Sequence, residues 1–258
     1  MSGRGLVLFL QALTLLGSAL TVVSLYRSGL YKRYRVFFSY FLFRLPNSLW
    51  PLLLPSGSNA YFYLWVITQP LIWLFHVLVV RELIGLVLER HKGLNTLGRW
   101  AMYFGVVVSV TLSLVTMLLK FKPGAAQSSR IIAYVYGTDR GVELCLALFL
   151  ILMVLLVSRY PVALSRNIIL HVVLFTSFFL GTSLTALLRS VLGIHLFTSI
   201  DVGFMALAAA CTFGWFFFLT PKGEEVEAPK QYFPEGQEDR LLYHLDTLNA
   251  TLLKVARK

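Results

Sequence analysis

Seven stretches of mostly apolar residues follow one another along the chain, separated by short polar segments. A helix rises about 1.5 Å per residue, so about 20 residues cross the roughly 30 Å hydrocarbon layer of a bilayer. The apolar residues are continuous rather than alternating, which favours helices over the strands of a barrel. The pattern predicts an all-α, polytopic membrane protein with seven transmembrane helices, over residues 5–26, 36–54, 60–80, 100–119, 131–157, 167–188 and 200–219.

The polar C-terminal part of the chain follows a different pattern. Residues 222–236 contain Pro, Gly and several acids, which is typical of a linker. Beyond it, four leucines recur at helical spacing within residues 237–258, and they predict a cytoplasmic amphipathic helix. These leucines are Leu241, Leu245, Leu248 and Leu252. The chain therefore divides into a transmembrane domain (1–221), a linker (222–236) and a tail helix (237–258).

The leucine face of the tail helix leaves two interpretations open. The helix can dock against the bundle or lie on lipid head groups, or it can bind a cytoplasmic protein partner. On the fourth apolar stretch, Gly105, Ser109 and Ser113 recur every fourth residue. Such small residues let helix backbones approach closely, so we expect this face to pack inside the bundle, with a dimer interface as the alternative.

Composition agrees with a membrane protein. Of the 258 residues, 57% are hydrophobic and 14% are charged, whereas a soluble domain has about 25% charged residues. A soluble globular domain is therefore excluded. The long apolar stretches exclude disorder, and two Cys residues are too few for a disulfide scaffold.

Lys and Arg are unevenly distributed between the two sets of connections. Nine lie on the connections after the first, third and fifth stretches, five lie on the opposite side, and the C-terminal tail adds six to the first side. Cytoplasmic connections of membrane proteins carry such an excess, so we expect an outside N-terminus and a cytoplasmic C-terminus. The net charge of +11 also attracts anionic head groups. Nucleic-acid binding is not expected, because the basic loops lack an aromatic-interleaved platform.

Five polar residues form a candidate pocket in the inner half of the membrane domain: Arg44, Asn47, His76, Glu82 and His171. Arg44 is expected about 12 Å deep, and the two histidines about 7–8 Å deep. Ionisable groups at membrane depth are candidates for function. Either Arg44 binds an anion or the histidines relay protons; alternatively, Arg44 snorkels or pairs with Glu82 while each histidine caps a carbonyl. No metal or cofactor is expected, because motifs such as HExxH or CxxC are absent.

A second polar cluster is predicted near the outer ends of the last three apolar stretches. It comprises Asp139, Arg140, Glu143, Arg189 and Asp201. Asp201 lies in the first turn of the seventh helix, where an acid complements the helix dipole, so a structural role is favoured over a ligand or cation site. Glu143 lies one turn deeper than Asp139, where a carboxyl group can stay neutral.

Several aromatic and basic motifs carry a resemblance to a known group. They are the segments 35–41 (RVFFSYF), 61–65 (YFYLW), 81–83 (REL) and 158–160 (SRY). With these motifs, the chain resembles an uncharacterised family of seven-pass bacterial membrane proteins that is often found in acidobacteria. The resemblance covers residues 1–221 and extends to the tail helix. It implies a bacterial inner-membrane location and the same architecture, and it implies no activity.

These observations favour a non-enzymatic membrane protein that acts as a sensor or accessory component for an unknown ligand. The first alternative is a carrier of a small anion or a lipid head group, with Arg44 as the anion contact. The second is a membrane-embedded enzyme, although no local grouping of a nucleophile, a His and a carboxylate supports it. The expected environment is the lipid bilayer, including anionic head groups, and the sequence does not indicate an oligomeric state.

Overall fold

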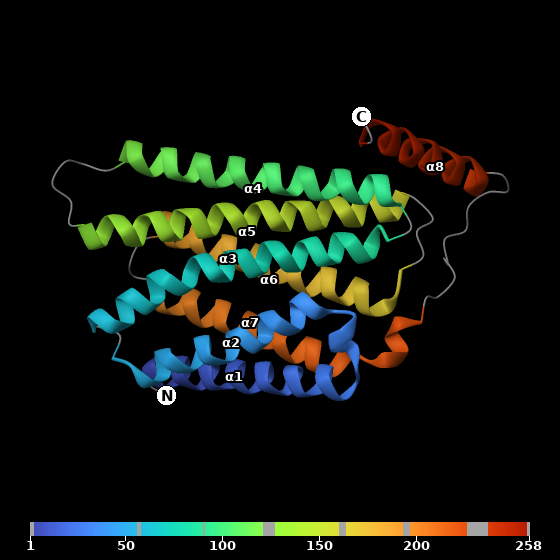
Figure 1. Ribbon diagram of the computed structural model, residues 1–258. Helices are drawn as coiled ribbons and strands as arrows, with labels where there is room; N and C mark the ends of the chain where they lie inside the picture. Colours follow the sequence, from blue (N-terminus) through green and yellow to red (C-terminus); the bar gives the residue numbers. More distant parts are fainter. Residues whose placement is uncertain are drawn as a thin grey trace.

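The computed structural model describes residues 3–55, 58–89, 91–120, 127–159, 164–192, 197–225 and 237–256. Within these residues it contains eight α-helices, two short 3-10 helices and no strand, which confirms the all-α prediction (Figure 1). The seven long helices of the bundle are α1 (Gly3–Arg27), α2 (Arg35–Leu53), α3 (Asn59–Val87), α4 (Lys92–Lys120), α5 (Gln127–Arg159), α6 (Arg166–Leu192) and α7 (Phe197–Phe218). The eighth helix, α8 (Gln237–Ala256), lies at one end of the bundle.

Each predicted apolar stretch lies in a separate long helix, but several helices extend beyond their stretch. α3 continues to Val87 rather than ending near residue 80, and α4 begins at Lys92 rather than near residue 100. Apolar composition marks the part of a helix that suits lipid, whereas Arg, Glu and Lys have good helix propensity and prolong the helix into water.

Four helices of the described residues are long and apolar enough to cross a membrane: Gly5–Arg27 in α1, Asn59–Val87 in α3, Lys92–Thr116 in α4 and Arg166–Thr185 in α6. α7 contains a shorter apolar helix, Val202–Phe218. The surface agrees with these spans. On α4, Trp100 and Phe104 are 70% and 71% exposed, and their exposed apolar neighbours are Val107, Val108, Leu112 and Leu118. An apolar face of this size on a folded chain suits contact with lipid.

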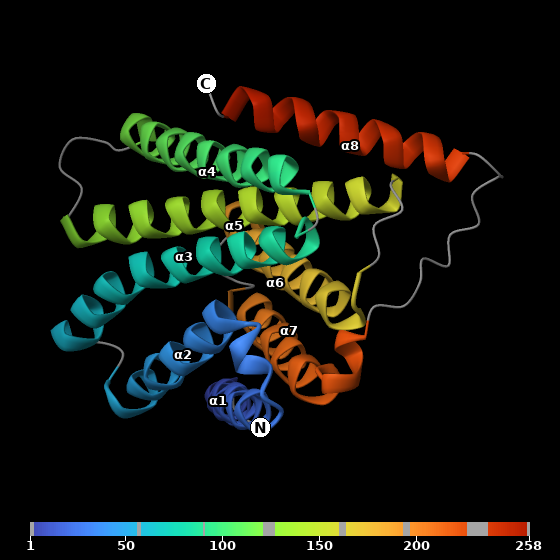
Figure 2. The same cartoon turned by 45° about the vertical axis from the view of Figure 1, so that its right-hand side comes forward.

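The helices are arranged so that the first and last of the bundle are neighbours. α1 packs against α2 and α7, and the hydroxyl of Thr21 donates a hydrogen bond to the carbonyl of Thr212 at 3.2 Å. α5 packs against α3, α4 and α6, while α4 lies at the edge with α8 beside it (Figure 2). The hydroxyl of Ser109 on α4 donates to the carbonyl of Gly141 on α5 at 2.6 Å. The small face of α4 therefore packs inside the bundle.

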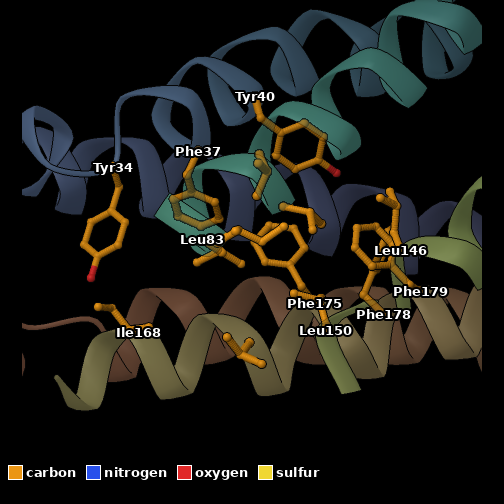
Figure 3. Packing of buried hydrophobic residues seen from close by; sticks show 14 of the residues in the cluster. Tyr34, Phe37, Tyr40, Leu83, Leu146, Leu150, Ile168, Phe175, Phe178 and Phe179 are labelled. Carbon is orange, nitrogen blue, oxygen red and sulfur yellow. The ribbon is translucent and has the colours of Figure 1, made fainter. Parts of the chain in front are cut away.

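Aromatic side chains fill the space between α2, α6 and α7. Figure 3 shows Tyr34, Phe37 and Tyr40 in a row along the start of α2, with side chains of α6 opposite. The ring of Phe37 lies edge-on to Phe175 and Trp215, at centroid distances of 5.7 and 5.4 Å. Edge-to-face rings at such distances contribute about 0.5–1.5 kcal/mol per pair beyond the burial of their area.

One end of the bundle gathers the basic connections. At this end α1, α3, α5 and α7 finish and α2, α4 and α6 begin, and α8 lies at the same end (Figure 1). We call it the basic end, and its described basic residues include Arg27, Lys32, Arg33, Arg35, Lys92, Arg99, Arg159, Arg166, Lys222 and Arg240.

Candidate functional site

A chain of four polar side chains crosses the core from α2 to α5. Arg44 Nη1 donates a hydrogen bond to the hydroxyl of Tyr40 at 3.1 Å. That hydroxyl lies 3.3 Å from Nε2 of His76 on α3. Nδ1 of the same histidine lies 3.6 Å from Oε1 of Glu143 on α5, which is longer than a hydrogen bond, and has no hydrogen-bond partner within the described residues. We call Arg44, Tyr40, His76 and Glu143 the core polar chain.

The direction of these contacts follows from the hydrogen-bonding capacity of each group. A guanidinium group only donates, so the Tyr40 oxygen accepts from Arg44 and its own proton is free to face Nε2 of His76. When Nε2 accepts this proton, the proton of the neutral imidazole lies on Nδ1, which faces Glu143. Every donor in the chain therefore points away from Arg44 and toward Glu143.

The chain lies deep in the bundle. α3 continues from His76 to Val87, about 16 Å of helix. Glu143 stands at the middle of α5. His76 is 1% exposed and Glu143 is 3% exposed. The structure therefore brings two residues of the predicted inner pocket, Arg44 and His76, together with Glu143 of the predicted outer cluster.

Arg44 is surrounded by aromatic rings rather than by carboxylates. Its guanidinium carbon lies 5.8 Å from the ring centroids of Tyr40 and Phe41 and 5.6 Å from that of Phe178. Among the described residues, no carboxylate lies within ion-pair distance of Arg44. Ring faces attract a cation but carry no net charge. The acidic group to which Arg44 is linked is Glu143, through Tyr40 and His76.

Two other predicted pocket residues have local structural roles. The carboxylate of Glu82 accepts hydrogen bonds from the backbone N–H groups of Val36 at 2.9 Å and Phe37 at 3.0 Å. It therefore caps the start of α2 and does not pair with Arg44. The side-chain oxygen of Asn47 accepts a hydrogen bond from Nε1 of Trp50 at 3.1 Å, within the same helix.

His171 occupies an aromatic cage next to the basic end. Its ring lies 4.5 Å from that of Tyr34 and 4.4 Å from that of Phe37, measured between centroids. The side chain is fully buried, and neither ring nitrogen has a hydrogen-bond partner within the described part of the chain. The expected capping of a backbone carbonyl by this histidine is therefore not observed.

The remaining residues of the predicted outer cluster are dispersed. Nε1 of Trp73 donates a hydrogen bond to the carboxylate of Asp139 at 2.6 Å, one turn of α5 before Glu143. The side chain of Arg140 is exposed. The side chains of Arg189 and Asp201 lie outside the described part of the structure.

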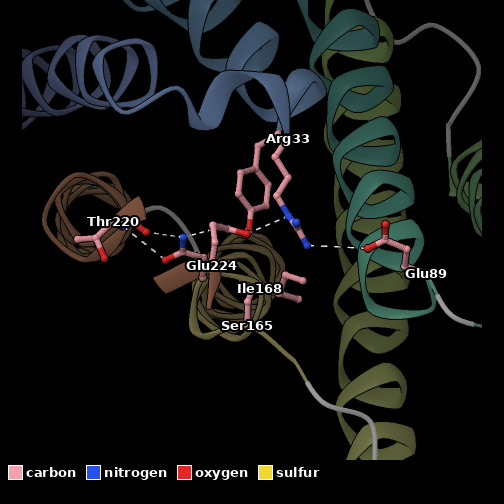
Figure 4. Close-up of polar contacts among 8 residues, drawn as sticks. Arg33, Glu89, Ser165, Ile168, Thr220 and Glu224 are labelled. Carbon is pink, nitrogen blue, oxygen red and sulfur yellow. Dashed lines mark hydrogen bonds and ion pairs between the residues drawn. The ribbon is translucent and has the colours of Figure 1, made fainter. Parts of the chain in front are cut away.

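At the basic end, the segment after α7 is bound to the start of α2. Glu224, at the end of the 3-10 helix Pro221–Glu224, accepts a hydrogen bond from the Tyr34 hydroxyl at 2.7 Å. It also forms an ion pair with Nε of Arg33 at 2.9 Å. Nδ2 of Asn167 donates to Glu224 and to the carbonyl of Thr220. Figure 4 shows Arg33 between Glu224 on one side and Glu89 on the other. Residues 222–225 of the expected linker are thus held on the bundle, and residues 226–236 lie outside the described part.

Burial of Tyr34, reinforced by its hydrogen bond to Glu224, raises the pKa of its phenol far above the ordinary value of 10. Both effects disfavour the phenolate, because it would be poorly solvated and would face a carboxylate. Tyr34 therefore remains a neutral donor to Glu224 throughout the physiological range.

The tail helix docks on the first turns of α4. The side-chain oxygen of Asn249 accepts a hydrogen bond from the backbone N–H of Gly93 at 2.7 Å. Leu245 is 2% exposed, whereas Leu248 is 49% exposed. The side chains of Leu241 and Leu252 lie outside the described part. One of the four leucines expected to bind a partner is therefore already used within the chain.

Sequence reasoning missed Tyr40, Glu224 and Asn249. Tyr40 precedes Arg44 by four residues, and residues at this spacing lie on one face of a helix. That spacing was a usable indication that Tyr40 belongs to the site. Glu224 and Asn249 make contacts only between segments that are distant along the chain, and no local pattern marks them.

The chemistry available in the core is proton exchange and anion attraction. Among the described residues, no group of three or more His, Cys, Asp or Glu side chains is placed to hold a metal ion. Comparison of the chain with protein-family models, with curated proteins and with solved structures finds no match.

Proposed function

We propose that this chain is a non-enzymatic, seven-pass membrane protein of the bacterial inner membrane that acts as a sensor or accessory component. In this proposal the core polar chain receives the stimulus, and the basic end with α8 delivers the response. The N-terminus lies outside, and the C-terminus lies in the cytoplasm beside anionic head groups. The resemblance of the aromatic motifs to a seven-pass bacterial family supports the architecture.

The observation that carries the proposal is the double attachment of α2. Tyr40 and Arg44 belong to the core polar chain, while Arg33 and Tyr34, just before α2, bind Glu224. A shift of α2 along its axis therefore changes contacts in the core and at the basic end together. Packed helices move as rigid elements between discrete arrangements, so one helix can link two sites.

The coupling is tested by measuring the distance between α4 and α8 in the reconstituted protein. Spin labels replace Leu97 on α4 and Tyr243 on α8, which are both exposed, in a background where Cys145 and Cys211 are Ala. We expect His76→Gln to shift or broaden the distance distribution obtained by double electron–electron resonance.

The matched control is Leu148→Ala, since Leu148 is an exposed apolar residue on the same helix as Glu143. It should leave the distribution unchanged. Identical distributions in the parent protein and in correctly folded His76→Gln would refute the sensor proposal.

The orientation has its own test. Reporter fusions made after Arg33 and after Lys254 should both be active on the cytoplasmic side, whereas a fusion within residues 121–126 should report the outside. Opposite compartments for the first two fusions would contradict the seven-pass topology.

A carrier of a small anion is the second candidate function, and the position of Arg44 favours it. Its guanidinium lies among rings without a carboxylate partner in the described residues, which leaves charge available for an anion. Protein in vesicles should then transport phosphate or chloride, and Arg44→Ala should abolish the flux. The sensor proposal expects no flux from either protein.

A further inference from the structure

We propose that His76 and Glu143 form a buried proton-binding site, so that the ligand of the core polar chain is the proton. Naming the proton as the stimulus rests on the proposed sensor function, whereas proton binding by the pair stands on the geometry alone. The site binds one exchangeable proton, which is carried on the Glu143 carboxyl group when it is bound.

The first argument is the unused hydrogen-bonding capacity of the Glu143 carboxyl group. Its Oε1 faces Nδ1 of His76, while Oε2 is buried and has no hydrogen-bond partner within the described residues. A carboxylate oxygen without a donor is costly in an apolar interior. A proton on Oε2 removes the charge, and loss of that proton restores a carboxylate that faces the imidazole N–H.

The second argument is charge balance along the core polar chain. With Glu143 ionised and His76 neutral, the carboxylate compensates the permanent charge of Arg44, and all donors point from the cation to the anion. With Glu143 protonated, the chain carries one uncompensated positive charge. Proton binding therefore changes the net charge of the core polar chain from zero to plus one, which alters how strongly α2 is held to α3.

The third argument concerns the charged and polar groups that face the pair. The groups that face the pair from the packed helices are Tyr40 and Arg44 on α2, Asp139 on α5, Phe178, Phe179 and Thr182 on α6, and Cys211 on α7 near Arg44. The hydroxyl of Thr182 donates to the carbonyl of Phe178 and also lies within reach of the Glu143 carboxyl group. Asp139 accepts from Trp73, so its carboxylate is held one turn from Glu143. The positive charge of Arg44 therefore disfavours a proton on Glu143, whereas the negative charge of Asp139 favours it.

The contact with α2 gives proton binding a route to the basic end. While Glu143 is ionised, its field favours the alignment of His76, Tyr40 and Arg44. Protonation of Glu143 removes this field. The attachment of α2 to the core through Arg44 then becomes weaker. The start of the same helix is bound to Glu224, so its displacement reaches the segment that leads to α8.

The site is tested by infrared difference spectroscopy of the full-length protein in vesicles, titrated between about pH 4 and pH 9. We expect the carbonyl band of one protonated carboxyl group to appear as the pH falls. Labelling glutamate with carbon-13 should shift this band, and Glu143→Gln should remove it. In case Glu143→Gln does not fold, Glu143→Asp should retain a band that no longer responds to labelled glutamate.

Two charge variants give the site a signature that a merely structural carboxyl would lack. Arg44→Gln removes a positive charge, so the midpoint of the band should move to higher pH by about one unit, a tenfold gain in proton affinity. Asp139→Asn removes a negative charge and should move the midpoint to lower pH. Absence of a titrating glutamate band, or midpoints unchanged in both variants, overturns the inference.

The spin-label distance between α4 and α8, measured at the two ends of the titration, separates this inference from the proposed function. If the Glu143 band titrates but the distance does not depend on pH, the proton site stands and the sensor proposal is refuted. If the distance depends on pH but no Glu143 band appears, the sensor proposal stands and the proton site is refuted. We expect the band and the distance to change with the same midpoint.

Discussion

The carboxylate of Glu82 accepts a hydrogen bond from the backbone N–H of Val36 at 2.9 Å, so a side chain of α3 caps α2. The first turn of a helix has N–H groups without intrahelical partners, and its partial positive charge favours a nearby anion. α2 has no acid in its own first turn and no side-chain cap from Tyr34. Glu82 supplies both from the neighbouring helix, and this fixes where α2 begins relative to α3.

Glu82→Ala is therefore expected to lower the free energy of unfolding by about 1–3 kcal/mol, because two buried N–H groups lose their acceptor. The measurement is SDS-induced unfolding in detergent, followed by circular dichroism. Glu89→Ala is the control, since Glu89 is exposed and lies 3.9 Å from Arg33. Its effect should stay within about 0.5 kcal/mol. Equal losses in the two variants would contradict the capping role.

Tyr34 provides a prediction about pH. Burial and the bond to Glu224 raise the pKa of Tyr34 in the folded state. Since the unfolded phenol titrates near pH 10, the stability from Tyr34 is complete below about pH 10 and is lost as the pH rises above it. Tyr34→Phe should cost about 1.5–3 kcal/mol at neutral pH, because Glu224 loses a donor.

The comparison of thermal melts at neutral and alkaline pH checks this prediction. The parent protein should lose more stability than Tyr34→Phe between about pH 9 and pH 11, because the variant lacks the group that titrates. Parallel losses in the two proteins would show that Tyr34 contributes nothing to the alkaline transition.

The helical architecture could be predicted from the sequence because it depends on local composition. A continuous apolar stretch in lipid must form its backbone hydrogen bonds within itself, and a helix does so. The ends of the helices were predicted less well. α3 was expected to end near residue 80, but it extends to Val87. Hydropathy locates the apolar part of a helix and gives no information on where the helix ends.

The site itself was predicted only in part. Arg44 and His76 were placed in one pocket, and the structure links them through Tyr40. Glu143 was assigned to the other cluster, yet it lies against His76. Rotation of each helix about its axis decides which side chains meet, and that rotation depends on packing between helices. Glu82 was expected beside Arg44, whereas the N–H groups at the start of α2 are better partners for its carboxylate.

The contact between α4 and α5 depends on the absence of a side chain at Gly141. A Cβ atom at this position would meet the hydroxyls of Ser109 and Ser113 and the backbone carbonyl of Ser109. Gly141→Ala is therefore expected to separate the helices and to cost about 1–3 kcal/mol. Gly203→Ala is the matched control, because a Cβ there meets nothing within 4 Å. It should be neutral or stabilising by up to about 1 kcal/mol. The measurement is the same SDS unfolding, and an equal effect at the two glycines would contradict this account.

The last prediction concerns Asn249, which joins α8 to α4. Its side-chain oxygen accepts from the backbone N–H of Gly93 in the first turn of α4, where such groups lack intrahelical partners. Asn249→Ala should remove this bond and weaken the docking of α8 while leaving the bundle folded, because α8 makes its packing contacts with α4. Hydrogen exchange followed by mass spectrometry should show faster exchange in the first turn of α4 and throughout α8.

Thr247→Ala is the control for this effect, since its hydroxyl is exposed and bonds to the carbonyl of Tyr243 within α8. It should leave exchange in α4 unchanged. The loss of one neutral hydrogen bond amounts to about 0.5–1.5 kcal/mol, so the opening of α8 should become roughly two to twelve times more frequent. If exchange in α8 rises while the first turn of α4 stays protected, another acceptor holds Gly93, and the response in the proposed sensor must reach α8 through Leu245 instead.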